Sequence, residues 1–125
     1  MTAPAARYPY EAAVTAYGNG GFRFADMSHK GSILCLPTGV YAWEPQSAAQ
    51  LVANHFARVL QDLKRPGVLL LGSGPTQVYP PVDVIAAFIE TRINLEVMST
   101  GAAVRTYNIM LGEKRIVAAA LIAVA

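Results

Sequence analysis

Four consecutive apolar residues, Val68-Leu69-Leu70-Leu71, constrain the fold of this 125-residue chain more than any other segment. Successive side chains of a strand point to opposite faces, so a strand that lacks polar alternation must be covered on both faces. Gly72-Ser73-Gly74-Pro75 follows the run and ends the strand. The run therefore predicts a central strand of a sheet that other elements cover on both sides.

The chain after this run alternates between helix and strand signals. The predicted elements are a helix from Pro81, a strand over 95–98, a helix from Thr100 and a strand over 116–124. The residues expected to be buried on the first of these helices are Val84 or Ile85, Phe88 and Ile89. Strand–helix–strand crossovers are normally right-handed and make neighbouring strands parallel. The second half of the chain thus predicts parallel strands joined by helices.

The first half carries the signals of antiparallel strands. Strands over 14–17 and 22–24 flank Gly18-Asn19-Gly20-Gly21, which is typical of a hairpin turn. Two more strands are expected over 32–36 and 40–43. Both halves together predict an α/β fold with a mixed sheet, an N-terminal β-hairpin and about three helices. We expect a flexible N-terminal arm over residues 1–10 and a single domain over residues 11–125.

A helix is expected after these strands, because Ser47 and Gln50 have the spacing of a capping box. Its apolar positions follow helical spacing and are Val52, Phe56, Val59, Leu60 and Leu63. Pro66-Gly67 ends this helix. Trp43, on the preceding strand, either covers the helix as part of the core or faces outward as an aromatic anchor for a partner.

The composition favours a protein that has partners. Hydrophobic residues make up 54% of the chain and charged residues 14%, against roughly 25% charged residues in average domains. The shortage of surface charge favours binding to other proteins or self-association. The net charge of +2 and the lack of a basic run with interleaved aromatic residues argue against nucleic-acid binding.

No segment of the sequence has the pattern of a membrane span or a secretory signal. The longest late apolar run, residues 116–125, has ten residues, whereas a span needs about 20. Residues 1–10 lack the apolar segment of a signal peptide. We therefore expect a soluble bacterial protein in the cytoplasm, without a transmembrane segment.

The sequence contains no recognisable set of catalytic or metal-binding residues. Cys35, the only cysteine, lies in an apolar strand and is expected to be a structural thiol. His29 lies in a predicted polar turn and His55 at the edge of a helix's apolar stripe, and neither has metal-ligand spacing. We expect no cofactor and no metal, and favour a protein without enzymatic activity.

The helix that begins at Thr100 has a normal apolar side and an unusual polar side. The apolar side consists of Ala103, Val104, Tyr107, Met110 and Leu111. The polar side consists of Gly101, Arg105, Asn108, Gly112 and Arg115. Glycine costs a helix about 1 kcal/mol relative to alanine, so two glycines there indicate a close neighbour. This side is either a binding surface or a solvated face, and Arg105 either binds an acidic group or is a buried structural cation.

The helix sequence, TGAAVRTYNIMLGEKR over residues 100–115, resembles a domain-of-unknown-function family. That family includes the mitochondrial respiratory complex I assembly factor 3, bacterial and archaeal single-domain members and an adipogenesis-associated animal protein. The resemblance continues in Arg23-Phe24, Gly31-Ser32-Ile33, the turn at 69–74 and residues 117–121. It implies a compact three-layer α/β fold with a mixed central sheet, and it supplies no catalytic residue.

Two functions follow from these observations. The first is a non-enzymatic protein-interaction or assembly factor whose partners are proteins such as subunits of a respiratory or membrane complex. The alternative is a small-molecule or anion-binding protein or enzyme with a pocket between Gly72-Ser73-Gly74 and Thr100, because open α/β sheets bind ligands at the carboxyl ends of their strands. The candidate binding residues are Arg105, Asn108, Gly101, Gly112, Thr100, Gly72, Ser73 and Gly74.

Overall fold

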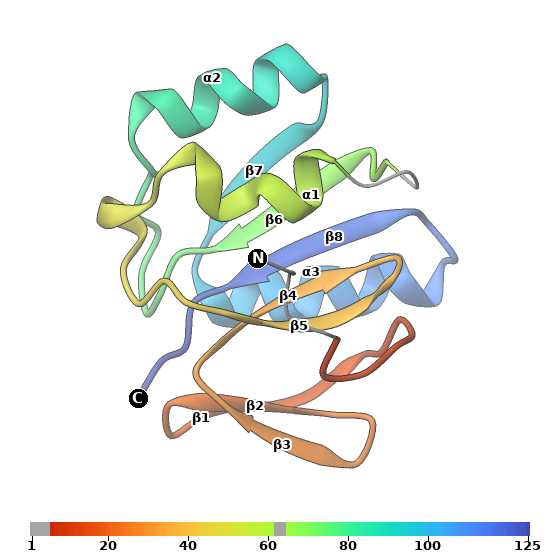
Figure 1. The fold of residues 1–125 in the computed structure, drawn as a ribbon. Coiled ribbons are helices and arrows are strands. Elements are labelled where there is room, and N and C mark those ends of the chain that lie inside the picture. The colour runs from red at the N-terminus through yellow and green to blue at the C-terminus, as the bar shows by residue number, and fades with distance from the viewer. Residues whose placement is uncertain (1–5, 62–64) are drawn as a thin grey trace.

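A five-stranded mixed sheet forms the centre of the molecule, and a three-stranded antiparallel sheet lies beside it (Figure 1). This computed structural model describes residues 6–61 and 65–125. The large sheet has the order β5-β4-β8-β6-β7 and consists of β4 (Ser32–Leu36), β5 (Gly39–Trp43), β6 (Val68–Gly72), β7 (Asn94–Met98) and β8 (Val117–Leu121). The small sheet has the order β1-β2-β3 and consists of β1 (Val14–Gly18), β2 (Gly21–Phe24) and β3 (Met27–Lys30).

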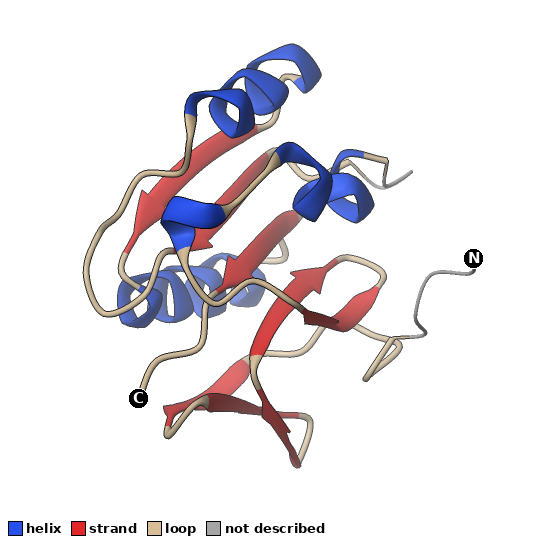
Figure 2. Ribbon diagram, turned by 60° about the vertical axis from the view of Figure 1, so that its left-hand side comes forward, coloured by secondary structure: helices blue, strands red, loops and turns tan. Residues whose placement is uncertain are grey.

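Helices cover both faces of the large sheet, as Figure 2 shows. One face carries α2 (Val82–Thr91) and three short pieces, η1 (Ala48–Gln50), η2 (Ala53–Phe56) and α1 (Ala57–Leu60). The other face carries α3 (Thr100–Gly112) together with the small sheet. This arrangement confirms the predicted three-layer α/β fold with a mixed sheet, an N-terminal hairpin and three helices.

Strand β6 is buried on both faces, as its sequence predicts. Leu69 and Leu71 join the core beneath α2, while Val68 and Leu70 join the core beneath α3. The strand pairs in parallel with β7 on one side and with β8 on the other. It is therefore an interior strand, but the middle position of the sheet belongs to β8.

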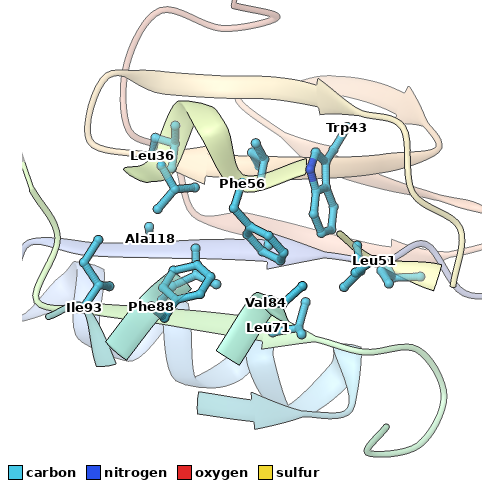
Figure 3. Packing of buried hydrophobic residues seen from close by; sticks show 14 of the residues in the cluster. Leu36, Trp43, Leu51, Phe56, Leu71, Val84, Phe88, Ile93 and Ala118 are labelled. Atoms are coloured by element: carbon cyan, nitrogen blue, oxygen red, sulfur yellow. The ribbon is translucent and has the colours of Figure 1, made fainter. Parts of the chain in front are cut away.

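Three aromatic side chains, Trp43, Phe56 and Phe88, pack together within the largely aliphatic core on the α2 face (Figure 3). The Phe56 ring lies edge-on against Trp43 at 5.4 Å and against Phe88 at 5.1 Å between centroids. The indole N–H of Trp43 donates to the His55 carbonyl at 2.8 Å, so Trp43 has its polar atom satisfied inside the core. The core interpretation of Trp43 is confirmed, and the outward anchor is excluded.

The segment after β5 does not form the single capped helix that the sequence predicts. Ser47 makes no side-chain cap bond, and Val52 has extended backbone angles and is 47% exposed. Leu51 and Phe56 are both buried, yet five positions along a helix correspond to about 140° around its axis. Breaking the helix between them turns both side chains inward. Leu63, also predicted in this stripe, lies outside the described residues.

Strand β3 was predicted as a polar turn and is instead the third strand of the small sheet. It pairs with β2, so that His29 lies opposite Phe22 and Met27 lies opposite Phe24. The turn between these strands has Ala25 and Asp26 at φ of 48° and 60°. Glycine or asparagine normally occupies such positions, so the sequence lacked the usual hairpin signal.

The two outer edges of the large sheet differ. On β5, the Val40 carbonyl accepts from the N–H of Arg7 at 2.7 Å, and the Val40 N–H donates to the Tyr8 carbonyl at 2.9 Å. The N-terminal segment thus covers that edge locally. On β7, no described strand pairs with the outer side. Of the two outer edges of the large sheet, only the β7 edge lacks a backbone partner among the described residues.

Candidate functional site

Thr100 lies at a junction between three segments and is fully buried. Its Oγ1 donates to the Ile122 carbonyl at 2.7 Å and accepts from the Gly74 N–H at 3.0 Å. Its own N–H donates to the Gly74 carbonyl at 2.8 Å. Ser99, not Thr100, is the N-cap of α3, because its Oγ accepts from the Ala102 N–H. Thr100 therefore joins the glycine turn, α3 and the chain after β8.

Several polar groups of the turn at Gly72-Ser73-Gly74 are occupied by hydrogen bonds within the domain. The Ser73 N–H donates to the Met98 carbonyl at 2.8 Å, and the Gly74 N–H is bonded to Thr100. The Ser73 hydroxyl accepts from the Val78 N–H at 2.8 Å and lies 2.8 Å from the Thr76 carbonyl. A Cβ atom at Gly72 would lie 2.9 Å from the Thr100 Cα. Gly72 and Thr100 pack directly together, so the fold itself uses these groups.

The close neighbour of the polar side of α3 is strand β1 of the same domain. Asn108 Oδ1 accepts from the Val14 N–H at 2.9 Å, and Asn108 Nδ2 donates to the Val14 carbonyl at 2.8 Å. At Gly101, a Cβ atom would collide with the Tyr17 hydroxyl. Gly101 and Asn108 therefore let β1 approach the helix. This contact within the domain explains why a glycine and an asparagine occupy these two positions of α3.

Arg105 and Gly112, the other two candidates on this side, face open space. Arg105 is exposed, which excludes the buried structural cation. It borders a shallow cavity of about 390 Å³ together with Tyr17, Gly74 and Gly101. No atom outside the helix lies within 4 Å of where a Gly112 Cβ would be. Of the predicted residues, Gly74, Gly101 and Arg105 are thus brought to one depression on the surface.

Burial shifts the pKa of three side chains, Cys35, Tyr107 and His29. Cys35 is fully buried, and burial raises the pKa of its thiol to about 12, which confirms the predicted structural thiol. Burial also raises the pKa of Tyr107, whose hydroxyl is the one buried side-chain polar atom without a partner among the described residues. Burial, and next the charge of Arg7, lower the pKa of His29. Burial thus disfavours the thiolate form of Cys35 near neutral pH.

The described residues form neither a metal-ligand cluster nor a membrane-spanning helix. Within residues 6–61 and 65–125, no three side chains of His, Cys, Asp or Glu gather as metal ligands would. None of the helices in the same ranges is both long and apolar enough to cross a bilayer.

Sequence reasoning missed an apolar groove between α2 and β7. The groove has a volume of about 440 Å³, and its lining includes Tyr79, Ile85, Ile89, Leu95 and Val97. Val84 and Phe88 of α2 are buried as predicted, but Ile89 is 72% exposed, contrary to the prediction.

Ile89 belongs to a second apolar stripe on α2, which lies beside the buried one. Val82, Ile85 and Ile89 have i, i+3, i+7 spacing and flank the buried pair. Val82 is 80% exposed, and Tyr79, just before the helix, is 64% exposed. This second stripe is the feature of the sequence that indicates an apolar surface outside the core.

Comparisons with solved structures support this fold throughout the chain. An outer membrane protein from Bartonella henselae is 45% identical, with a TM-score of 0.89, and the match covers 95% of this chain and all of that one. The Rpa2829 protein from Rhodopseudomonas palustris is 41% identical, with a TM-score of 0.81, over 98% of this chain and 91% of that one.

One curated relative has a name that describes a function. Over 113 residues, the chain is 32% identical to NADH dehydrogenase (ubiquinone) 1 alpha subcomplex assembly factor 3 of Drosophila melanogaster. The match covers 87% of this chain but 57% of the fruit-fly protein, so the chain spans little more than half of that relative's length. Residues 14–122 match the sequence profile of a family described as protein of unknown function (DUF498/DUF598). This match, together with the fold and the sequence of helix α3, shows that the chain belongs to the DUF498/DUF598 family.

Proposed function

We propose that this protein is a non-enzymatic interaction factor that helps other proteins assemble. The observation that carries this proposal is the exposed apolar surface formed by Val82 and Ile89 on the outer side of α2 and by Tyr79 just before the helix. Exposed apolar side chains that lie near a groove, and are not needed for the core, are typical of protein contact sites. We refer to these three residues as the α2 surface.

The similarity to a named assembly factor supports the same function. The fruit-fly relative is an assembly factor of NADH dehydrogenase, and the match covers most of this chain. We therefore propose that the partners are subunits of a respiratory or other membrane complex and that the protein acts on them from the cytoplasm. Self-association through the same surface is the competing outcome of the tests.

The alternative function, ligand binding at the glycine turn, has less support. The turn and Thr100 bond to one another, and the remaining open feature is the depression beside Arg105. We propose Arg105 and Gly112 as a secondary contact surface for an acidic group of the partner, because a guanidinium offers five donors in a fixed arrangement.

Site-specific crosslinking tests the proposed function. A photoreactive amino acid is placed at Ile89 and, as a matched control, at Ile109, which is 63% exposed on α3. After irradiation in cells of the source organism, we expect a defined protein adduct from position 89 and none from position 109. Mass spectrometry identifies the adduct. Equal labelling from both positions, or no adduct at all, would refute the proposal.

A further inference from the structure

We propose that the outer edge of β7 is a strand-addition site, at which an extended partner segment pairs with β7 and places apolar side chains in the groove beneath α2. This inference rests on the proposed function and adds the conformation and chemistry of the partner segment. Strand addition at an open sheet edge is an established mode of peptide recognition, in which backbone bonds give affinity and alternate side chains give specificity.

The hydrogen bonds of β7 show which backbone groups are free. The Asn94 N–H donates to the Gly67 carbonyl at 3.2 Å, and the Met98 carbonyl accepts from the Ser73 N–H. Backbone groups of alternate residues in a strand point to opposite neighbours, so Asn94, Glu96 and Met98 face β6. The backbone groups of Leu95 and Val97 therefore point outward, towards the open edge.

The outward-pointing carbonyl of Val97 already accepts a hydrogen bond from a side chain. Gln77 Nε2 donates to the Val97 carbonyl at 2.9 Å, from an exposed position in the loop before α2. An incoming backbone N–H can replace this amide without any change in the core. The Leu95 N–H, the Leu95 carbonyl and the Val97 N–H have no partner among the described residues, so they are available to a strand.

The groove lies on the side that suits an incoming strand. The Leu95 and Val97 side chains pack against the core on the α2 face, and both line the groove with Ile85 and Ile89. Residues directly opposite one another in a strand pair point to the same face. Partner residues opposite Leu95 and Val97 therefore enter the groove and must be apolar.

Glu96 sets the charge of the partner and disfavours a second copy of this chain. It is exposed and lies between Leu95 and Val97, on the other face of the sheet. Two β7 strands paired antiparallel through both Leu95 and Val97 would put Glu96 opposite Glu96. Like charges directly opposite destabilise a strand pair, whereas opposite charges stabilise it. The partner segment is thus a different chain, with alternating apolar residues around a lysine or arginine.

A peptide titration followed by NMR tests this site. The probe is an acetylated pentapeptide of sequence threonine-valine-lysine-valine-threonine, and a second peptide has glutamate in place of lysine. We expect shifts and slower hydrogen exchange at the amides of Leu95 and Val97, with the lysine peptide bound roughly three- to tenfold more tightly. Glu96→Lys should reverse the preference between the two peptides, since only the charge opposite the central residue has changed.

Backbone methylation of the probe separates strand pairing from apolar adhesion. In the antiparallel arrangement, the amides of both valines face β7 and the lysine amide faces away. Methylating the valine amides should abolish binding, and methylating the lysine amide should not. Equal binding of the two methylated peptides, or shifts without changes at Leu95 and Val97, would overturn the site.

The two proposals can fail separately. A protein adduct at Ile89 without peptide binding at the edge would refute strand addition and leave the assembly function standing. Peptide binding at the edge without any adduct in cells would refute the assembly function and support strand addition.

Discussion

Helices α2 and α3 cover opposite faces of one sheet, but their outer sides have different neighbours. On α3, strand β1 of the same domain covers part of the outer side, through Asn108 bonded to Val14 and Gly101 beneath the Tyr17 hydroxyl. On α2, Val82 and Ile89 are exposed. Polar residues and glycines on a helix can thus serve internal packing, whereas a second apolar stripe without a neighbour indicates a contact surface.

The largest expected effect comes from a charge placed in the core beneath α3, on the interior strand β6. Leu70→Asp buries a carboxylate without a partner in strand β6, which is fully enclosed. The free energy of unfolding should fall by several kcal/mol, comparable to the whole stability of about 5–15 kcal/mol of a typical domain. Chemical denaturation measures the change.

Ile89→Asp is the matched control on the open side of α2. Because Ile89 is 72% exposed, the unfolding free energy should change by no more than about 0.5 kcal/mol. A strong loss of stability in this variant would mean that the α2 surface belongs to the core. Near-wild-type stability of Leu70→Asp would contradict the enclosed position of β6.

A smaller effect is expected where α3 meets β1. Asn108→Ala removes both hydrogen bonds to Val14 and leaves a partly buried N–H and carbonyl without partners. The unfolding free energy should fall by about 1–3 kcal/mol. Arg105→Ala, on the same side of the helix, should change it by less than about 0.5 kcal/mol, because Arg105 is exposed.

Thermal melting of both variants decides how the outer side of α3 is used. If Arg105→Ala lowers the melting temperature as much as Asn108→Ala does, Arg105 has a structural role. If it weakens partner binding without a change in melting, the secondary contact surface gains support.

The smallest expected effect is an increase in stability. Tyr107→Phe removes a buried hydroxyl that has no partner, and should raise the unfolding free energy by about 1 kcal/mol. Tyr41→Phe is the control, because the Tyr41 hydroxyl lies 2.7 Å from Thr38 Oγ1, and should lower it by a similar amount. Equal effects of the two substitutions in urea denaturation would show that the Tyr107 hydroxyl is bonded in solution.

The sequence predicted correctly those elements in which the local periodicity of apolar residues agrees with the packing of the core. The apolar run at 68–71 and the apolar side of α3 both became core, and the parallel pairing of β6 with β7 and β8 followed from the crossovers. The helix expected from Ser47 failed because local spacing cannot reveal that Leu51 and Phe56 must both face inward.

The candidate site was predictable only in part. Gly101 correctly indicated a close neighbour of α3, whereas no such neighbour lies beside Gly112. Nothing local distinguishes a neighbouring strand from a partner. The Asn108 side chain bonds to Val14, which is 94 positions away in the chain. The groove depends on Tyr79, α2 and β7 meeting at one edge, which is a property of the tertiary arrangement.

The position of β8 in the middle of the sheet has a consequence for synthesis on the ribosome. This strand lies between β4 and β6, yet it follows both in the chain, and Ser32 beside it bonds to Ala123, 91 positions later. Until residues 117–121 have left the ribosome, β4–β5 and β6–β7 are two separate strand pairs with unpaired inner edges. Folding must therefore wait for late residues, and long-range pairing of this kind is slow and exposes the chain to aggregation. Nascent chains that stop before β8 should depend on chaperones far more than chains that include it.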